Sequence, residues 1–159
     1  MDRISEVAIK KAIEESKYNI KNDYRKGGPF GAVIVKDGKI ISFAHNTVIK
    51  NNDPTAHAEI NAIRKASKKL KSHNLSGCVL YTSAEPCPMC LSAIIWANIK
   101  DVYYVNDKKD AANIGFRDDM IYEYIKGNES SVLSLHHIED EDAIKVFDTF
   151  KKIKNKEMY

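Results

Sequence analysis

The stretch CVLYTSAEPCPMCLSAIIWANIKDVYYV, residues 78–105, decides the fold class. It opens with an apolar run, CVLYTS (residues 78–83), which is typical of a buried strand. PCPMCLSAIIWANI predicts a helix with Pro86 near its first turn, where the missing N–H of proline does little harm. DVYYV (residues 101–105) predicts a second strand. Strand, helix and strand in this order indicate a right-handed crossover between parallel neighbours.

The segments before this stretch predict two helices and a hairpin. Residues 2–20 carry apolar side chains at roughly helical spacing, as an amphipathic helix does. The short apolar runs AVIV (residues 32–35) and IISFA (residues 40–44) flank Asp37-Gly38, a strong hairpin signal because glycine takes the positive φ of a tight turn. A second helix is expected after Thr55, with one apolar face and one face of arginine and lysine.

The segments after it complete one α/β domain of residues 1–159. Residues 106–130 predict a loop and a short helix, and VLSLHHI (residues 132–138) predicts a last strand. Residues 139–155 predict a helix that acidic residues open and lysines close, in agreement with the helix dipole. Its apolar face is formed by Ile144, Phe147 and Phe150. We expect three layers, with a mixed sheet of about five strands and helices on both faces.

Composition and charge bound the function. The 159 residues are 43% hydrophobic and 30% charged, as in a soluble globular domain. A formal charge of +3 does not argue for nucleic acid, and we interpret the lysine-rich residues 68–71 and 151–156 as solvated surface. No signal peptide or membrane-spanning run is recognisable. Three cysteines cannot all pair, which favours a reducing compartment, so we expect a cytoplasmic protein.

The candidate chemistry lies in two stretches, DPTAHAEINAI (residues 53–63) and PCPMC. Cys87 and Cys90 are three residues apart, which places both sulfurs on one side of a helix. His57 lies at the start of the other helix, so two converging helix N-termini offer one nitrogen and two sulfurs to a single ion. Zinc takes such mixed ligands, and three protein ligands leave a fourth position for a water activated towards hydroxide. Cys78, inside an apolar strand, is interpreted as a core residue.

Glu59 lies two residues after His57 and has two interpretations. Beside a metal site, its carboxylate can take a proton from the water and deliver protons to a leaving group. Taken alone, it is a first-turn glutamate that serves the helix dipole. The neighbouring PCPMC motif favours the first interpretation.

The motifs HAE and PCPMC together match the signature of zinc nucleobase deaminases, and the chain resembles the cytidine deaminase superfamily over most of its length. This resemblance implies a three-layer cytidine-deaminase-like fold, one zinc ion per chain and hydrolytic loss of ammonia from a ring. GGPFGAVIV, HNTV, NDPTAHAEINAIRKA, LYTSAEPCPMCLSAI, DAANIGFRDD and the closing EMY are most similar to small bacterial guanine deaminases, which implies conversion of guanine to xanthine and ammonia. Two positions depart from that family: Ala84 stands where many members have a cysteine, and Arg117 where we expect an acidic residue.

The resemblance also implies roles around the substrate. Asn46 would hydrogen-bond the purine, Phe30 would pack against it, and Asp118 would contact the guanine edge and help to move protons. It implies a homodimer in which the last helix and tail, about residues 140–159, pack on the partner subunit, with Tyr159 helping to close the pocket. The alternatives are a turn residue for Asn46, a core residue for Phe30, a helix cap for Asp118 and a frayed end for Tyr159.

Several other functions remain open. A transfer-RNA adenosine deaminase shares both motifs, but it should carry a concentrated basic surface for RNA, whereas acidic residues follow the last strand of the crossover. Cytosine, cytidine and guanosine deaminases are further enzymatic alternatives. A zinc-stabilised binding module without activity is the alternative from another class.

Overall fold

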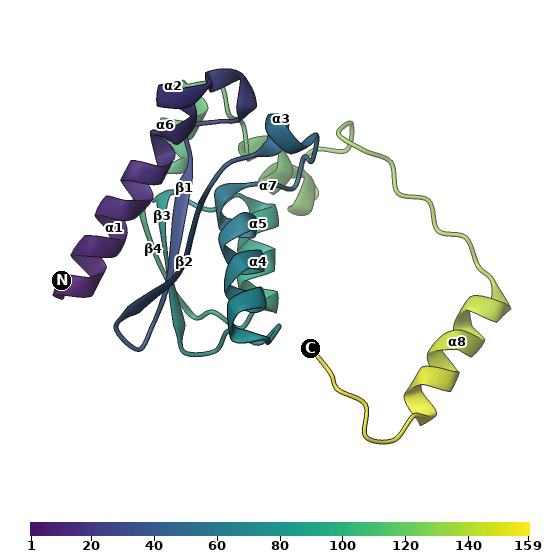
Figure 1. Ribbon diagram of the computed structural model, residues 1–159. Helices are drawn as coiled ribbons and strands as arrows, with labels where there is room; N and C mark the ends of the chain where they lie inside the picture. The colour runs from purple at the N-terminus through teal and green to yellow at the C-terminus, as the bar shows by residue number, and fades with distance from the viewer.

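The computed structural model describes residues 1–159 and has at its centre a four-stranded sheet in the order β2-β1-β3-β4 (Figure 1). β1 (Gly31–Lys36) is antiparallel to β2 (Lys39–His45) and to β3 (Cys78–Ala84), and β4 (Asp101–Asn106) is parallel to β3. The parallel pairing that residues 78–105 predict is therefore present, with a helix between the two strands.

Helices cover both faces of the sheet, as expected. α1 (Arg3–Ser16) lies on one face, and α4 (Ala58–Leu70) and α5 (Pro88–Trp96) lie on the other (Figure 1). Side chains alternate between the two faces along each strand. On β1, Val33 packs towards α1 and Ile34 packs towards α4, and both side chains are fully buried. The predicted α/β class is confirmed.

The β1–β2 hairpin closes through a two-residue turn at Asp37-Gly38. Both residues have positive φ, 48° and 70°, which is the conformation that matches the twist of a two-residue hairpin. The hairpin signal in the sequence is confirmed. It brings the end of β2, at His45, beside the start of β1, and the two loops that follow and precede these ends border the cavity described below.

The remaining helical segments are short, and most lie around one end of the sheet. The sequence predicts a single helix over residues 2–20, but the structure breaks it after Ser16 and also forms a helical turn after β2. These segments are α2 (Tyr18–Asn22), the 3-10 helix η1 (Tyr24–Lys26), α3 (Val48–Asn51), α6 (Lys108–Asn113) and α7 (Asp119–Ile125).

Two expectations are corrected. Residues 132–138, predicted as a strand, have no strand partner in the chain, so the sheet has four strands rather than about five. α5 begins at Pro88 with Cys87 as its N-cap, so Pro88 rather than Pro86 occupies the first turn. The reason is local: the first-turn position without an N–H partner falls one residue after the N-cap.

The C-terminal arm, residues 127–159, leaves the rest of the molecule as an extended segment, forms α8 (Glu141–Lys152) and then returns, so that Tyr159 lies beside Trp96 (Figure 1). Every residue of α8 is exposed, including the apolar residues of its predicted face. The helix itself is predicted correctly, and its acidic start and basic end are present.

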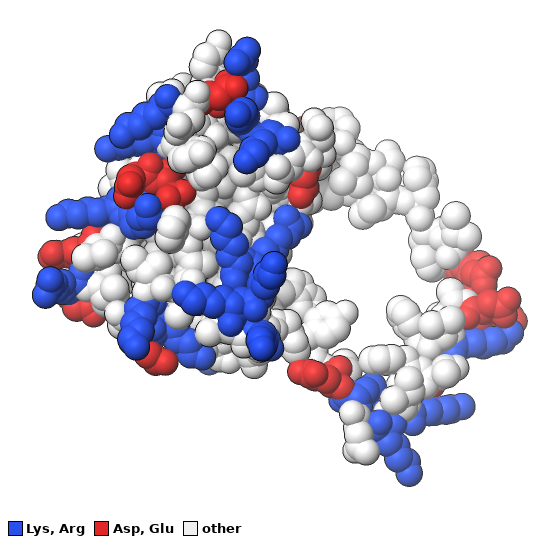
Figure 2. Space-filling view, in the orientation of Figure 1, with Lys and Arg blue, Asp and Glu red and all other residues white.

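Charged side chains gather over α4, where Figure 2 shows a group of lysine and arginine side chains. Lys65 and Lys69 donate hydrogen bonds to the carbonyl oxygens of Phe43 and Ile41 on β2, an outer strand of the sheet. These lysines therefore cover a sheet edge, as edge-strand lysines commonly do. None of the helices is both long and apolar enough to cross a membrane.

Candidate metal centre and active site

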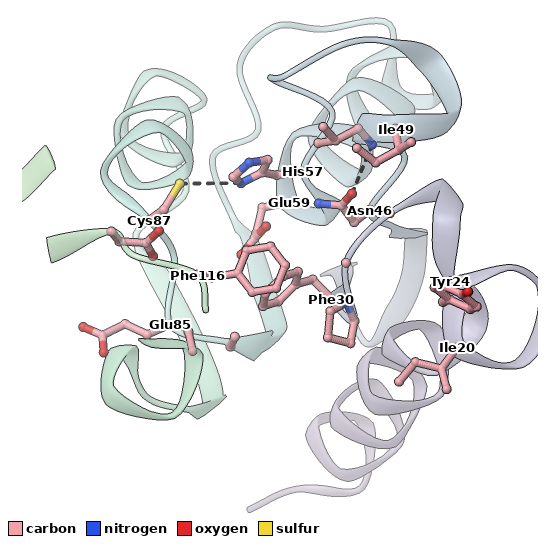
Figure 3. Close-up of a pocket in the computed structure, with 17 residues that line it drawn as sticks. Ile20, Tyr24, Phe30, Asn46, Ile49, His57, Glu59, Glu85, Cys87 and Phe116 are labelled. Carbon is pink, nitrogen blue, oxygen red and sulfur yellow. Dashed lines mark hydrogen bonds between the residues drawn. The ribbon is translucent and has the colours of Figure 1, made fainter. Parts of the chain in front are cut away.

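His57, Cys87 and Cys90 come together where α4 and α5 begin. His57 is the N-cap of α4 and Cys87 is the N-cap of α5, while Cys90 lies on the first turn of α5. The His57 Nδ1 atom lies 3.6 Å from the Cys87 sulfur (Figure 3) and 3.5 Å from the Cys90 sulfur. The three potential ligand atoms all lie within 4.8 Å of one another. The spacing in the sequence thus brings together the expected group.

The donor set and its spacing fit a zinc ion. A tetrahedral zinc ion, about 2.0–2.1 Å from nitrogen and about 2.3 Å from sulfur, separates these donors by about 3.6 Å. The observed nitrogen–sulfur distances of 3.5 and 3.6 Å agree with this expected separation. Cys78, the third cysteine, is buried in the core of the sheet and is not part of the group.

Electrostatics favour a thiolate in this group. Hydrogen bonds from Cys90 and His57 lower the pKa of Cys87 to about 4. The pKa of Cys90 is raised by the adjacent Cys87 and by burial. The hydrogen bond to Cys87 also raises the pKa of His57. A positively charged ion beside the three groups would stabilise both thiolates and displace these protons.

Glu59 lies on the first turn of α4 and is 6% exposed. Its Oε2 atom is 3.5 Å from the Cys90 sulfur, and its Oε1 atom accepts a hydrogen bond from the Thr82 hydroxyl at 3.1 Å. Burial raises the pKa of this carboxyl above its ordinary value. A buried carboxyl with a raised pKa beside a metal group is suited to exchange protons. It is not a surface glutamate that serves only the helix dipole.

A cavity of about 450 Å³ opens onto this group (Figure 3). This volume lies within the range typical of small-molecule sites. His57, Glu59 and Cys87 form part of its wall, together with Phe30, Asn46 and Asp118. All the predicted site residues therefore border one space, except Tyr159 and the fully buried Cys90. The other lining residues are Ile20, Tyr24, Gly27, Gly28, Pro29, Val48, Ile49, Ala84, Glu85, Ala111 and Phe116.

Asn46 presents a hydrogen-bond donor to the cavity. Its Oδ1 atom accepts a hydrogen bond from the backbone N–H of Val48 at 3.0 Å, which fixes the orientation of the amide. The NH₂ group of the amide has no hydrogen-bond partner within the chain and points into the cavity (Figure 3). Asn46 is thus both the turn residue of the alternative interpretation and a lining residue. A carbonyl oxygen or a ring nitrogen of a ligand would accept a hydrogen bond from this NH₂ group.

Asn19, for which the sequence predicts no role, joins the loop before β1 to the loop after β2. Its side-chain NH₂ donates to the carbonyl of Asn46 at 2.8 Å and to that of Gly28 at 3.0 Å, and the residue is 3% exposed. Gly27 permits this close approach, because a Cβ atom there would lie 2.6 Å from the Asn46 Oδ1 atom. The glycine pair in GGPFG is the signal available in the sequence, whereas Asn19 carries none.

Two aromatic rings and an acid form another part of the wall. The rings of Phe30 and Phe116 meet edge to face with centroids 4.9 Å apart (Figure 3). Phe30 also packs against the core, as its alternative interpretation has it, and its contact with a purine stays a prediction. Asp118 precedes α7 but makes no capping hydrogen bond, and burial raises the pKa of its carboxyl. Its side chain is therefore available to a ligand.

Three further positions lie differently. The Arg117 side chain is paired with Asp119 at 3.1 Å and does not line the cavity, whereas Ala84 does. Tyr159 packs beside Trp96 and His73, with ring centroids 5.9 and 6.3 Å apart. Trp96 is the last residue of α5, at the end opposite to the cysteines. Within one chain Tyr159 is therefore not brought to the cavity, and its expected contact with a partner subunit stays a prediction.

The comparison with protein families decides the relationship. The sequence model of the cytidine and deoxycytidylate deaminase zinc-binding region matches residues 3–106. The chain belongs to this deaminase family. The matched residues include His57, Glu59, Cys87 and Cys90, so the family match covers the whole metal group.

Within the deaminase family, the relatives differ in how much of the chain they cover. The guanine deaminase of Bacillus subtilis is 49% identical over 134 residues, 84% of this chain and 86% of that protein. A tRNA-specific adenosine deaminase of Aquifex aeolicus is 45% identical over 106 residues, 65% of this chain and 68% of that protein.

The solved structures agree. The crystal structure of Bacillus subtilis guanine deaminase superposes with a TM-score of 0.89 and 42% identity, covering 100% of this chain and 99% of that chain. The protein NE0047 in complex with 2,6-diaminopurine superposes with a TM-score of 0.67 and 36% identity, covering 72% of this chain and 62% of that chain. The likeness to Bacillus subtilis guanine deaminase thus extends through the C-terminal arm.

Proposed function

We propose that this deaminase hydrolyses guanine to xanthine and ammonia with the help of one zinc ion. The observation that carries the proposal is the match to Bacillus subtilis guanine deaminase over the whole chain, combined with a cavity that opens onto the His57, Cys87 and Cys90 group. His57, Cys87 and Cys90 would hold the zinc ion. Zinc in such a site lowers the pKa of a bound water and supplies a nucleophile near neutral pH.

The chain's own residues then bind and orient the base. The Asn46 NH₂ group donates to the carbonyl or a ring nitrogen of guanine, and the faces and edges of Phe30 and Phe116 contact its ring. Asp118 accepts from the N–H groups along the guanine edge. These contacts would present C2, the carbon that carries the amino group, to the metal side of the cavity. The complex of NE0047 with 2,6-diaminopurine supports a purine pocket of this kind.

Glu59 moves the protons. Its carboxylate takes a proton from the attacking water and delivers it to the ring as the carbon–oxygen bond forms at C2. It then takes the remaining proton from the C2 hydroxyl and delivers it to the departing amine as the carbon–nitrogen bond breaks and the C2 carbonyl forms, so that guanine and water become xanthine and ammonia. The buried, hydrogen-bonded position of Glu59 supports this role, because a carboxyl with a raised pKa both releases and recovers a proton readily.

The charge of the cavity favours a neutral base over a polynucleotide. Its lining includes the acidic residues Glu59, Glu85 and Asp118 but no lysine or arginine. A site that holds an RNA strand is normally basic, because it must neutralise phosphates. Lys65 and Lys69 of α4 instead cover the edge of the sheet at β2, and Arg64 pairs with Asp53. The three free cysteines fit a reducing compartment, and we place the enzyme in the cytoplasm.

The C-terminal arm supports a homodimer. Ile144, Phe147 and Phe150 of α8 are 61%, 77% and 47% exposed, which an isolated subunit would not favour. β4 is an outer strand and exposes Tyr103, Tyr104 and Val105. Residues 130–138 carry no lysine, arginine, aspartate or glutamate, and this part of the arm is white in Figure 2. We assign residues 140–159, with Tyr159, to contacts with a second copy of the chain.

A substrate panel tests the function. The zinc-loaded protein would be incubated with guanine, guanosine, adenine, cytosine, cytidine and an adenosine-containing anticodon stem-loop, and ammonia would be measured. We expect the highest kcat/KM for guanine. A higher kcat/KM for any other substrate would contradict the proposal and identify deamination of that substrate as the function. Full zinc content without ammonia release from any substrate would favour the alternative function, a zinc-stabilised binding module.

A further inference from the structure

We infer that Thr82 is a positioning residue for the reaction: its hydroxyl holds one oxygen of Glu59 and thereby directs the other towards the metal group. This inference rests on the proposed deamination. It starts from an isolated polar residue in an otherwise apolar place. Thr82 lies on β3, is 1% exposed, and is flanked on its face of the sheet by Leu80 and Ala84.

The geometry connects Thr82 to Glu59 across a long sequence separation. The Thr82 Oγ1 atom lies 3.1 Å from the Glu59 Oε1 atom. Side chains on a strand alternate between faces, so Thr82 and Leu80 face α4, whereas Tyr81 faces α1. This places the hydroxyl beneath the first turn of α4, where Glu59 begins.

The hydroxyl is the one side-chain oxygen or nitrogen donor that reaches Glu59. The other side-chain partner of the carboxylate is the Cys90 sulfur, 3.5 Å from Oε2. With zinc bound, Cys90 is a thiolate and has no proton to donate. Glu59 would then depend on Thr82 for its side-chain hydrogen bond.

A single hydroxyl hydrogen must choose among three acceptors. Thr82 Oγ1 also lies 3.1 Å from the carbonyl oxygen of Ala84 and 3.4 Å from that of Gly31. A hydrogen bond to an ionised carboxylate is stronger than one to a neutral carbonyl, so the Glu59 contact is favoured.

The two oxygens of Glu59 therefore have different roles. The Thr82 hydroxyl on β3 holds Oε1, and Oε2 faces the Cys90 sulfur. Oε2 is therefore the oxygen that exchanges protons with water and substrate. Without the hydroxyl, the buried carboxylate would lose this orientation and would turn towards other donors, including water in the cavity.

The test compares Thr82→Val, which keeps the shape but removes the hydroxyl, with Thr82→Ser, which keeps the hydroxyl. For the zinc-loaded enzyme we expect Thr82→Val to lower kcat by about tenfold or more, because hydrogen bonds to charged groups are among the strong ones. KM and zinc content should stay unchanged. Thr82→Ser should retain most of the kcat of the wild-type enzyme. Crystal structures of both variants should show the Glu59 carboxylate displaced only in Thr82→Val.

A matched control is Ser42→Ala, which removes another buried hydroxyl, one that donates to the Ala62 carbonyl at 2.8 Å away from Glu59. It should lower stability without lowering kcat. A kcat of Thr82→Val equal to that of the wild type, an unmoved carboxylate, or equal losses in Thr82→Val and Thr82→Ser would overturn the inference. A wild-type protein that deaminates another base would overturn the proposed substrate instead, and the comparison of variants would then be made on that base.

Discussion

At the scale of single residues, Glu59 illustrates how a site can be costly for the fold and useful for chemistry. It is almost fully buried between the Thr82 hydroxyl and the Cys90 sulfur, and burial raises the pKa of its carboxyl above the ordinary value of 4.5. Such groups are common where proton transfer occurs, because the reaction benefits from an environment that the folded state does not favour.

We expect Glu59→Gln to retain zinc but to lose at least about a hundredfold in kcat, since a positioned acid or base contributes typically 10²–10⁴-fold. Zinc content and ammonia release would be measured on the same preparation. A variant with full zinc and substantial activity would remove Glu59 from the proton transfers.

The same substitution should raise the stability of the zinc-free protein at pH 7. Because the folded pKa of Glu59 is raised, its contribution to stability is fully present below the unfolded pKa of about 4.5 and is lost as pH rises through the folded value. Glu59→Gln removes this loss, so its advantage should be present at pH 7 and disappear near pH 4. Denaturant unfolding at both pH values measures it, and an equal effect at both would contradict the shift.

We expect Asn19 to affect substrate binding through its hydrogen bond to the Asn46 carbonyl. Asn19→Asp replaces the NH₂ group that bridges two carbonyls by an oxygen that both carbonyls repel. We expect KM for guanine to rise at least roughly threefold, the worth of an ordinary hydrogen bond, with a smaller change in kcat. Asn22→Asp is the control, because Asn22 lies on the same short helix but is exposed. Equal effects of the two variants would contradict a specific role.

At the scale of elements, the approach of α1 to β1 positions the cavity wall. A Cβ atom at Gly31 would lie 2.2 Å from the carbonyl oxygen of Ala12 and 2.6 Å from the backbone N of Ser16. The start of β1 therefore touches the backbone of α1 directly, and this contact sets the place of the loop that carries Phe30.

We expect Gly31→Ala to destabilise the fold by about 2 kcal/mol or more, because overpacking against backbone cannot be relieved by a side-chain rotation. Gly127→Ala provides the comparison: Gly127 has a φ of 82° and nothing near its absent Cβ, so only backbone strain of about 1 kcal/mol is expected there. Thermal and urea unfolding measure both. A smaller loss for Gly31→Ala than for Gly127→Ala would contradict the close contact.

The elements also mark how far the sequence alone could predict the structure. Local chemistry identified the hairpin at Asp37-Gly38 and the two helix starts at His57 and Cys87, because turn residues and ligand spacing act within a few positions. The strand expected over residues 132–138 fails for another reason: the segment is rich in apolar residues, but a strand needs hydrogen bonds from a neighbour, and the single chain supplies none. Asn19 bonds to residues 9 and 27 positions away, which no local pattern reveals.

At the scale of the whole molecule, the exposed arm leads to an expected dimer. Phe147→Glu places a carboxylate on the apolar face of α8 and should shift the protein from dimer to monomer, because burying an unpaired charge at an interface is unfavourable. Thr149→Glu adds the same charge on the opposite side of the helix and should leave the dimer intact. Sedimentation velocity of both variants decides. A monomeric wild-type protein would contradict the assignment of residues 140–159 to a partner.

The most direct measurement is a zinc titration of the metal-free protein, with ammonia release from guanine as the readout. We expect activity to rise in proportion to added zinc and to level at one zinc ion per chain, and Cys90→Ala to abolish both tight zinc binding and activity. Full activity in the metal-free protein, or an unchanged titration in the Cys90 variant, would contradict a zinc-dependent deaminase built on these three ligands.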